Sequence, residues 1–103
     1  MSAYQLTSKA EDDLFAIWSF IARDNIEAAD RVEAAIHRAC TFLAAEPLRG
    51  HVRQDLTNLP VRFWTVLRYS NYVVVYDPAT EPLRVIRILH RARDITTVFK
   101  EQG

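Results

Sequence analysis

The sequence is poor in cysteine, glycine and metal-binding clusters, and each scarcity excludes a class of protein. Cys40 is the single cysteine among 103 residues, so an intrachain disulfide is impossible and a reducing compartment is indicated. Cys40 has apolar neighbours and falls late in a predicted helix, which favours a buried thiol over a catalytic one. The three histidines have no metal-ligand spacing. We therefore expect neither a metal nor another cofactor.

Long apolar runs are also missing. No stretch approaches the roughly 20 residues that cross a bilayer. Residues 1–6 lack the basic and apolar regions of a secretion signal. We expect a cytoplasmic protein without membrane contact, folded as one domain over residues 1–103, a length typical of single domains.

The net charge is zero, but the charges are unevenly distributed. Residues 1–46 contain four basic and eight acidic residues, a net charge of −4, whereas residues 47–103 contain nine and five, a net charge of +4. Either one surface meets anions or acidic partners, or each half is simply solvated, and charge alone does not choose between them. The zero total argues against tight non-specific binding of nucleic acid by this chain alone.

Local patterns predict an opening strand followed by two helices. Residues 3–7 fit a short strand, and Ser8 with Glu11 forms a capping-box pattern at the start of a helix. The apolar stripe of this helix is Leu14, Ile17, Trp18 and Ile21. Asp24 or Asn25 can cap a second helix, which Pro47 ends. Its inner face is rich in alanine, so the two helices can approach closely as an antiparallel hairpin.

The second half of the chain predicts three strands and a last helix. A connector at residues 46–60 contains the lone internal glycine, Gly50, which predicts a positive φ. Strands are predicted at residues 61–69, 72–76 and 83–90, and the middle one is apolar enough to be covered on both faces. Asp94 can cap a short helix through Phe99. The order β-α-α-β-β-β-α indicates an α+β fold, with a helical hairpin on a mostly antiparallel four-stranded sheet.

Four stretches together carry a resemblance to a known family. They are an acidic helix start followed by Ile17-Trp18 (residues 10–18), a connector similar to Gly-x-x-Arg-x-Asp-Leu (47–56), an aromatic and valine-rich strand (69–76) and a basic segment (88–95). In this order they resemble the RelE/ParE toxin superfamily over essentially the whole chain, and they are closer to its ParE branch.

The resemblance implies the toxin of a type II toxin–antitoxin system, of the kind involved in plasmid stabilisation. A cognate ParD-like antitoxin would wrap the helices and the sheet edge, and operator DNA would be bound only through that antitoxin. ParE-like members are thought to poison DNA gyrase without catalysis of their own, whereas RelE-like members cut messenger RNA on the ribosome. A third possibility is a degenerate, non-toxic member that acts as a co-repressor with its antitoxin.

The groups that RelE-like cleavage would need are largely replaced. Trp64 and Val66 stand where the resemblance places lysines, Val73 where it places an arginine, and Phe99 where it places a tyrosine. Most of the means for proton transfer and for stabilising a pentavalent phosphate are therefore missing. If the chain were a ribonuclease, its catalytic residues would be His90, Arg91 and Arg93. Otherwise we expect no enzymatic activity.

The basic segment near the end of the chain is the predicted target-binding site. It comprises Arg87, His90, Arg91 and Arg93. Arginine suits bidentate contacts to carboxylate or phosphate. Strand alternation puts Arg87 and Arg91 on one face and Arg84 and His90 on the other, so that only twist or a bulge would reunite them. The alternative is an edge strand that is charged to prevent aggregation.

Antitoxin binding is predicted on the first helix. A toxin that is permanently bound by a partner should show an apolar patch when the partner is removed. The candidates are Leu14, Phe15, Trp18 and Ile21, of which Phe15 lies off the main apolar stripe. Trp18 and Trp64 also occupy positions that favour the core over a binding surface.

Overall fold

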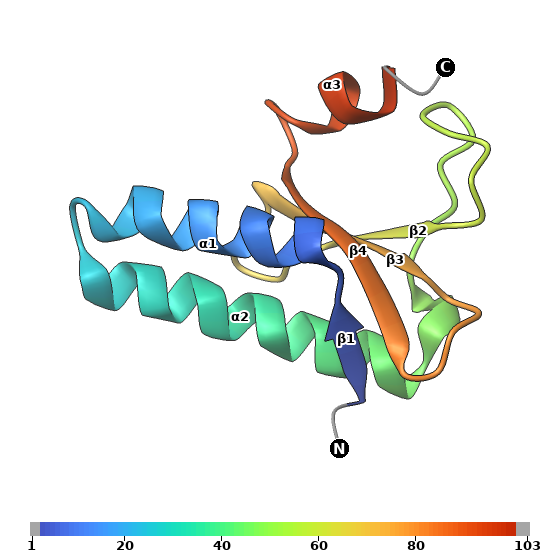
Figure 1. Ribbon diagram of the computed structural model, residues 1–103, viewed down its shortest axis with the longest axis horizontal. Helices are drawn as coiled ribbons and strands as arrows, with labels where there is room; N and C mark the ends of the chain where they lie inside the picture. The colour runs from blue at the N-terminus through green and yellow to red at the C-terminus, as the bar shows by residue number, and fades with distance from the viewer. Residues whose placement is uncertain (1–2, 101–103) are drawn as a thin grey trace.

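The computed structural model describes residues 3–100 and has the predicted order of elements (Figure 1). The helices are α1 (Ser8–Ala22), α2 (Ile26–Ala45) and α3 (Ile95–Lys100), and a 3-10 turn, η1 (Pro47–Arg49), follows α2. The strands are β1 (Tyr4–Leu6), β2 (Arg62–Thr65), β3 (Tyr72–Asp77) and β4 (Leu83–His90). The predicted α+β fold is confirmed. Within the described residues no helix is long and apolar enough to cross a membrane.

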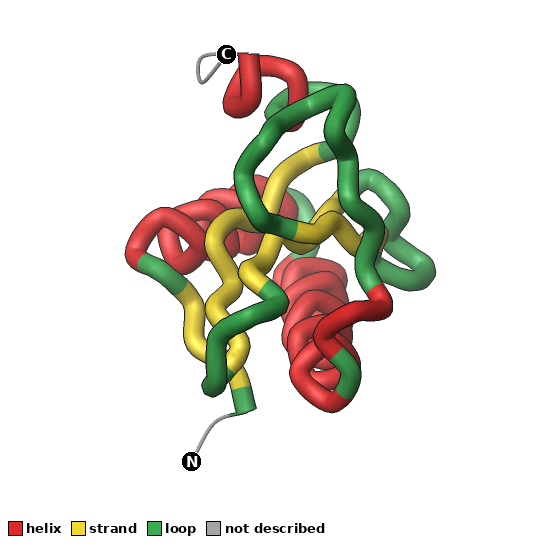
Figure 2. Tube along the Cα trace, turned by 90° about the vertical axis from the view of Figure 1, so that its right-hand side faces the viewer, coloured by secondary structure: helices red, strands yellow, loops and turns green. Residues whose placement is uncertain are grey.

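The four strands form one sheet in the order β1-β4-β3-β2. The β1–β4 pair is parallel and the other two pairs are antiparallel. α1 and α2 run in opposite directions beside each other, and α3 lies apart from them beyond the end of β4 (Figures 1 and 2). β3 is covered on both faces, as predicted. On one face Val74 and Tyr76 pack with the buried residues of α1 and α2, a cluster that we call the helix-side core. On the other face Val73 and Val75 pack with α3.

The first helix starts one residue earlier than the capping-box pattern predicts. Thr7, not Ser8, is the N-cap, and its Oγ1 accepts a hydrogen bond from the Ala10 N–H at 3.1 Å. Thr7 is also the residue at which the chain leaves the sheet, since its N–H donates to the Val85 carbonyl at 3.0 Å. The sheet contact therefore decides the position of the cap. At α2, Asn25 rather than Asp24 is the cap, with Oδ1 accepting from the Ala28 N–H.

The predicted positive φ of Gly50 is wrong, because its φ is −70°. Glycine is needed here for space. A Cβ at Gly50 would overlap the Tyr76 hydroxyl and would lie 2.8 Å from Tyr76 Cε1. The Gly50 N–H donates to Tyr76 Oη at 2.8 Å, and the hydroxyl donates to the Pro47 carbonyl at 2.6 Å. The connector is thereby held against β3 by one buried tyrosine.

β2 is shorter than predicted, and a turn replaces its second half. Pairing with β3 ends at Thr65, and the Val66 N–H then donates to the Tyr72 carbonyl at 3.0 Å. Arg68, inside this turn, has a φ of 71° and is the one non-glycine residue with a positive φ among residues 3–100. Alternation alone could not show this turn, because the apolar and aromatic residues continue through it.

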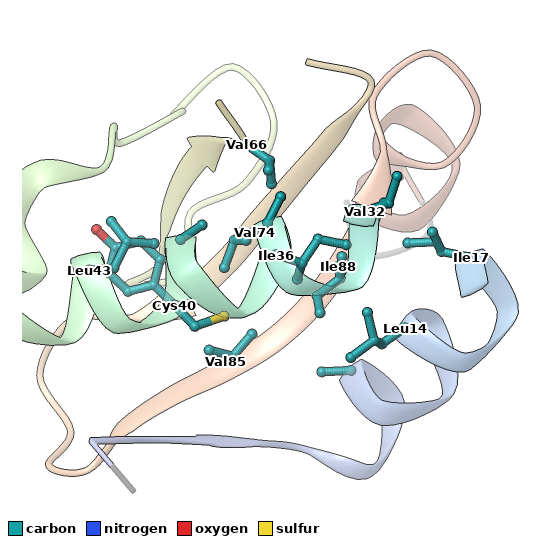
Figure 3. Packing of buried hydrophobic residues seen from close by; sticks show 14 of the residues in the cluster. Leu14, Ile17, Val32, Ile36, Cys40, Leu43, Val66, Val74, Val85 and Ile88 are labelled. Atoms are coloured by element: carbon teal, nitrogen blue, oxygen red, sulfur yellow. The ribbon is translucent and has the colours of Figure 1, made fainter. Parts of the chain in front are cut away.

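Cys40 is fully buried on α2, where it packs beside Ile36 and Leu43 in the helix-side core (Figure 3). Burial raises the pKa of its thiol to about 12. At pH 8 we expect a thiol-specific reagent to label the folded protein on the order of 1,000-fold more slowly than the urea-unfolded chain, because the thiolate is the nucleophile. Since only the unfolded thiol ionises easily, stability should also fall as the pH rises above about 9. Equal labelling rates in both states would contradict this burial.

Candidate functional site

The C-terminal end of β4 and the turn after it contain the predicted target-binding residues. Arg87 lies within the sheet, where it makes a bidentate ion pair with Asp13 of α1. Its Nε is 2.8 Å from Oδ2, and its Nη2 is 3.0 Å from Oδ1. The hydrogen bonds that the Arg87 guanidinium donates to Asp13 raise its pKa. With only 23% of its side chain exposed, Arg87 joins α1 to β4 and offers little free surface in this conformation.

Asp13 also completes the hydrogen bonding of a strand edge. β1 pairs with β4 only as far as Val85. Beyond that point the Thr7 hydroxyl donates to the Ile86 carbonyl at 2.8 Å, and the Ile88 N–H donates to Asp13 Oδ2 at 3.0 Å. Side chains thus satisfy the part of the β4 edge that β1 does not reach, which protects this edge from pairing with another chain.

His90 is half-buried at the end of β4. Its ring meets Tyr72 edge to face, with ring centroids 5.7 Å apart, and its Nδ1 is buried without a hydrogen-bond partner among the described residues. The His90 N–H donates to Asp94 Oδ2 at 2.9 Å. Burial raises the pKa of Asp94, but hydrogen bonds from the His90 N–H and from Arg93 outweigh it and hold that pKa below its ordinary value. Asp94 is therefore a carboxylate that orders the turn.

Arg91 and Arg93 are the exposed cations of this turn. Arg93 Nε lies 3.2 Å from Asp94 Oδ1, with 62% of the Arg93 side chain exposed. Arg91 has no carboxylate within ion-pair distance in the described part of the chain, and its N–H donates to the Asn71 carbonyl. Arg93 and His90 line one hollow of about 550 Å³ against α1, whereas Arg84 lines another beside β1. The structure thus brings His90 and Arg93 together and leaves Arg84 apart.

The β-bulge that could have reunited the arginines is present, but it does not gather them. Tyr76 pairs with Val85 and Val75 pairs with Arg87, so Ile86 is the extra residue of β4. Arg87 turns to Asp13, while Arg91 and Arg93 lie beyond the last paired residue. The site is therefore a turn with two exposed arginines and one histidine.

The hollow beside His90 also contains an aromatic residue that the sequence analysis missed. Phe20 of α1 is 62% exposed and lies on its rim together with Tyr72. The available signal was its position off the apolar stripe of α1, the same signal that singled out Phe15. An exposed aromatic ring beside cations is a typical element of a protein-binding surface.

The positions that RelE-like cleavage would use contain apolar side chains. Val66 and Val73 are buried, and Trp64 packs against the helix-side core. Phe99 is buried against Phe63, with ring centroids 5.3 Å apart. No cluster of three or more metal-ligating side chains occurs within residues 3–100. The arrangement offers one imidazole and two guanidinium groups, which suits binding of anionic groups better than proton transfer.

The predicted antitoxin-binding residues of α1 are largely covered. Leu14 is 7% exposed and lies in the core (Figure 3). Ile21 packs against that core, and Trp18 Nε1 donates to Asp30 Oδ1 of α2 at 2.8 Å, so that it links the two helices. Phe15, at 70% exposure, is the member of the set that is presented to a partner. Antitoxin binding by these residues stays a prediction.

Comparisons with known proteins agree with this architecture. A family model described as the ParE toxin of a type II toxin–antitoxin system, parDE, matches residues 4–95. A solved structure of the chromosomal ParDE TA system from P. aeruginosa is 23% identical, with a TM-score of 0.68, over 87% of this chain and 96% of that one. No curated protein matches the chain.

Proposed function

This chain belongs to the ParE toxin family, and from that premise we propose that it inhibits bacterial growth by binding DNA gyrase and is neutralised by a cognate ParD-like antitoxin. The observation that carries the proposal is the turn after β4, where Arg91 and Arg93 are exposed beside His90. Guanidinium groups make bidentate contacts to carboxylates and phosphates, and both groups are available where a target protein meets DNA. The interaction would take place in the cytoplasm.

The proposed activity is inhibition by binding, without catalysis by the toxin itself. A ribonuclease that uses the 2′-hydroxyl needs a base, an acid and cations around one phosphate. At the matching positions this chain has Trp64, Val66, Val73 and Phe99, none of which transfers a proton. The two exposed arginines, Arg91 and Arg93, can bind a partner without help from these positions.

A supercoiling assay tests the gyrase proposal. Purified toxin should inhibit supercoiling of relaxed plasmid by gyrase, and the Arg91→Glu/Arg93→Glu double variant should need at least about tenfold more protein, because each lost charge-assisted contact is worth roughly 1.5–3 kcal/mol. Arg84→Glu is the matched control, since Arg84 is an exposed arginine of β4, ahead of this turn, that lines a different hollow. Full supercoiling activity at a large excess of wild-type toxin would refute gyrase binding.

One observation favours the second candidate, an mRNA endonuclease. His90 Nδ1 is buried without a partner, beside a hollow that also contains Arg93 and the Tyr72 ring. If His90 acts as the base or the acid of cleavage, the His90→Gln variant should not cut messenger RNA on translating ribosomes. Toeprinting with the wild-type chain decides the matter: codon-specific cuts that disappear in His90→Gln would establish cleavage, and uncut messages would leave binding as the activity.

A further inference from the structure

The hollow beside His90 is formed by α1 as well as by the turn after β4. We call it the α1–turn hollow, and its volume is about 550 Å³. α1 lines it with residues at helical spacing, Asp13, Ala16, Ile17 and Phe20. The opposite wall comes from the β2–β3 turn (66–71), the two strands and the turn after β4, with Asn71, Tyr72, Ile88, His90, Arg93 and Asp94. The hollow thus connects the turn that contains Arg93 to the surface of a helix.

Phe20, on the rim of this hollow, is not part of the packed interior. Its exposed fraction is 62%, and it belongs neither to the two buried apolar clusters of the described chain nor to the partly buried residues packed against them. Ile17, one turn earlier, is 7% exposed and lies in the helix-side core. Ala16 is exposed and adds only a methyl group to the wall. A large aromatic side chain that the fold leaves in water beside a hollow is typical of an anchor that a partner buries.

The charges in the wall select an apolar group as the occupant. Two carboxylates, those of Asp13 and Asp94, line the hollow against a single guanidinium group, that of Arg93. Both carboxylates are held in place by hydrogen bonds from the backbone of β4. A phosphate diester inside the hollow would be close to both of them and would be repelled. An apolar side chain meets no such repulsion and would pack on the Phe20 and Tyr72 rings.

The exposed cations beside the hollow define what surrounds that apolar group. Arg93 has 62% of its side chain exposed, and Arg91 is exposed two residues earlier. Carboxylates that flank the inserted side chain would reach these guanidinium groups in charge-assisted contacts. The complementary partner is therefore a protein segment in which an apolar side chain has acidic neighbours.

We propose that the α1–turn hollow receives an apolar side chain from an acidic segment of the gyrase protein, with Phe20 as the anchor on the toxin. This inference rests on the proposed inhibition of gyrase, and it deepens that function in two ways. The toxin contacts the protein and not the DNA that gyrase holds. The contact surface also continues from the turn after β4 onto α1.

The test uses the full toxin chain and purified gyrase without DNA, with affinity measured by surface plasmon resonance at low and high salt. Phe20→Ala should weaken binding by at least about tenfold, as truncation of an interface anchor does. Its salt dependence should equal that of the wild type, because no charge is removed. Ala16→Leu, which narrows the hollow from an exposed helical position, should also weaken binding. Both variants should melt as the wild type does, since exposed substitutions change stability little.

Phe15→Ala is the matched control. Phe15 is a phenylalanine of the same helix with 70% exposure, and it is not among the residues that line the hollow. Its truncation should leave the affinity within about twofold of the wild type, as expected for a residue outside the contact. Addition of DNA to gyrase should likewise leave the affinity of the wild-type toxin unchanged.

Each other outcome counts against a defined claim. If the wild-type chain binds gyrase neither with nor without DNA, the proposed function fails and the inference fails with it. If the wild-type chain inhibits gyrase but Phe20→Ala binds as Phe15→Ala does, the proposed function stands and the inference alone is overturned. Binding that requires DNA would overturn the protein contact, and normal binding by Ala16→Leu would overturn occupation of the hollow. A dimer of the isolated chain that Phe20→Ala dissociates would assign the surface to a second copy instead.

Discussion

Gly50→Ala is expected to lower the free energy of unfolding by about 3 kcal/mol, the upper part of the range for inserting an atom into a packed site and breaking a buried hydrogen bond. The new methyl group would overlap the Tyr76 hydroxyl. Tyr76 cannot retreat easily, because it is fully buried on β3 and its hydroxyl bonds both the Gly50 N–H and the Pro47 carbonyl. Urea denaturation followed by circular dichroism gives the difference in unfolding free energy.

A double-mutant cycle with Tyr76→Phe identifies the cause. Tyr76→Phe alone removes both hydrogen bonds and should cost about 1–3 kcal/mol. In the Tyr76→Phe background, Gly50→Ala should cost clearly less than in the wild type, since the nearest clashing atom is gone. Additive effects would mean that the close approach of Gly50 to Tyr76 does not determine stability.

Gly50 illustrates how much of the fold the sequence determines locally. Helical periodicity located α1 and α2, and the valine run located β3, because these patterns depend on neighbours in the sequence. A glycine in a loop also suggests a local reason, a positive φ. The actual reason is a tyrosine 26 residues later in the chain, which only the packed structure brings into contact with it. Local patterns could not show it.

The candidate site was predictable in composition but not in geometry. Sequence spacing gathered Arg87, Arg91 and Arg93 into one segment. Packing then divided them, because Asp13, 74 residues away, pairs with Arg87 and leaves the other two at the surface. The hollow lined by Phe42 of α2 and Leu67 of the β2–β3 turn was not predicted at all, since these residues meet only in the folded chain. Long-range ion pairs and grooves arise only when elements meet.

Asp13→Ala is expected to destabilise the protein by about 3 kcal/mol, although Asp13 lies in a helix where alanine is the better helix former. The carboxylate is 16% exposed and accepts hydrogen bonds from Arg87 Nε, Arg87 Nη2 and the Ile88 N–H. Its removal leaves a half-buried guanidinium without its counter-charge and a strand-edge N–H without an acceptor. Each of these losses raises the free energy of the folded state alone, because water hydrates both groups in the unfolded chain. Thermal and urea denaturation measure the sum.

Neighbouring and compensating variants separate the ion pair from helix propensity. Asp12→Ala removes an exposed carboxylate from the same turn and should change the unfolding free energy by less than about 0.5 kcal/mol. Asp13→Ala combined with Arg87→Met should recover part of the loss, because the buried charge that lacked a partner is removed as well. If Asp13→Ala and Asp12→Ala were equally stable, the junction of α1 and β4 would be held by apolar packing alone. The hydrogen bond from the Ile88 N–H to Asp13 would then contribute no measurable stability either.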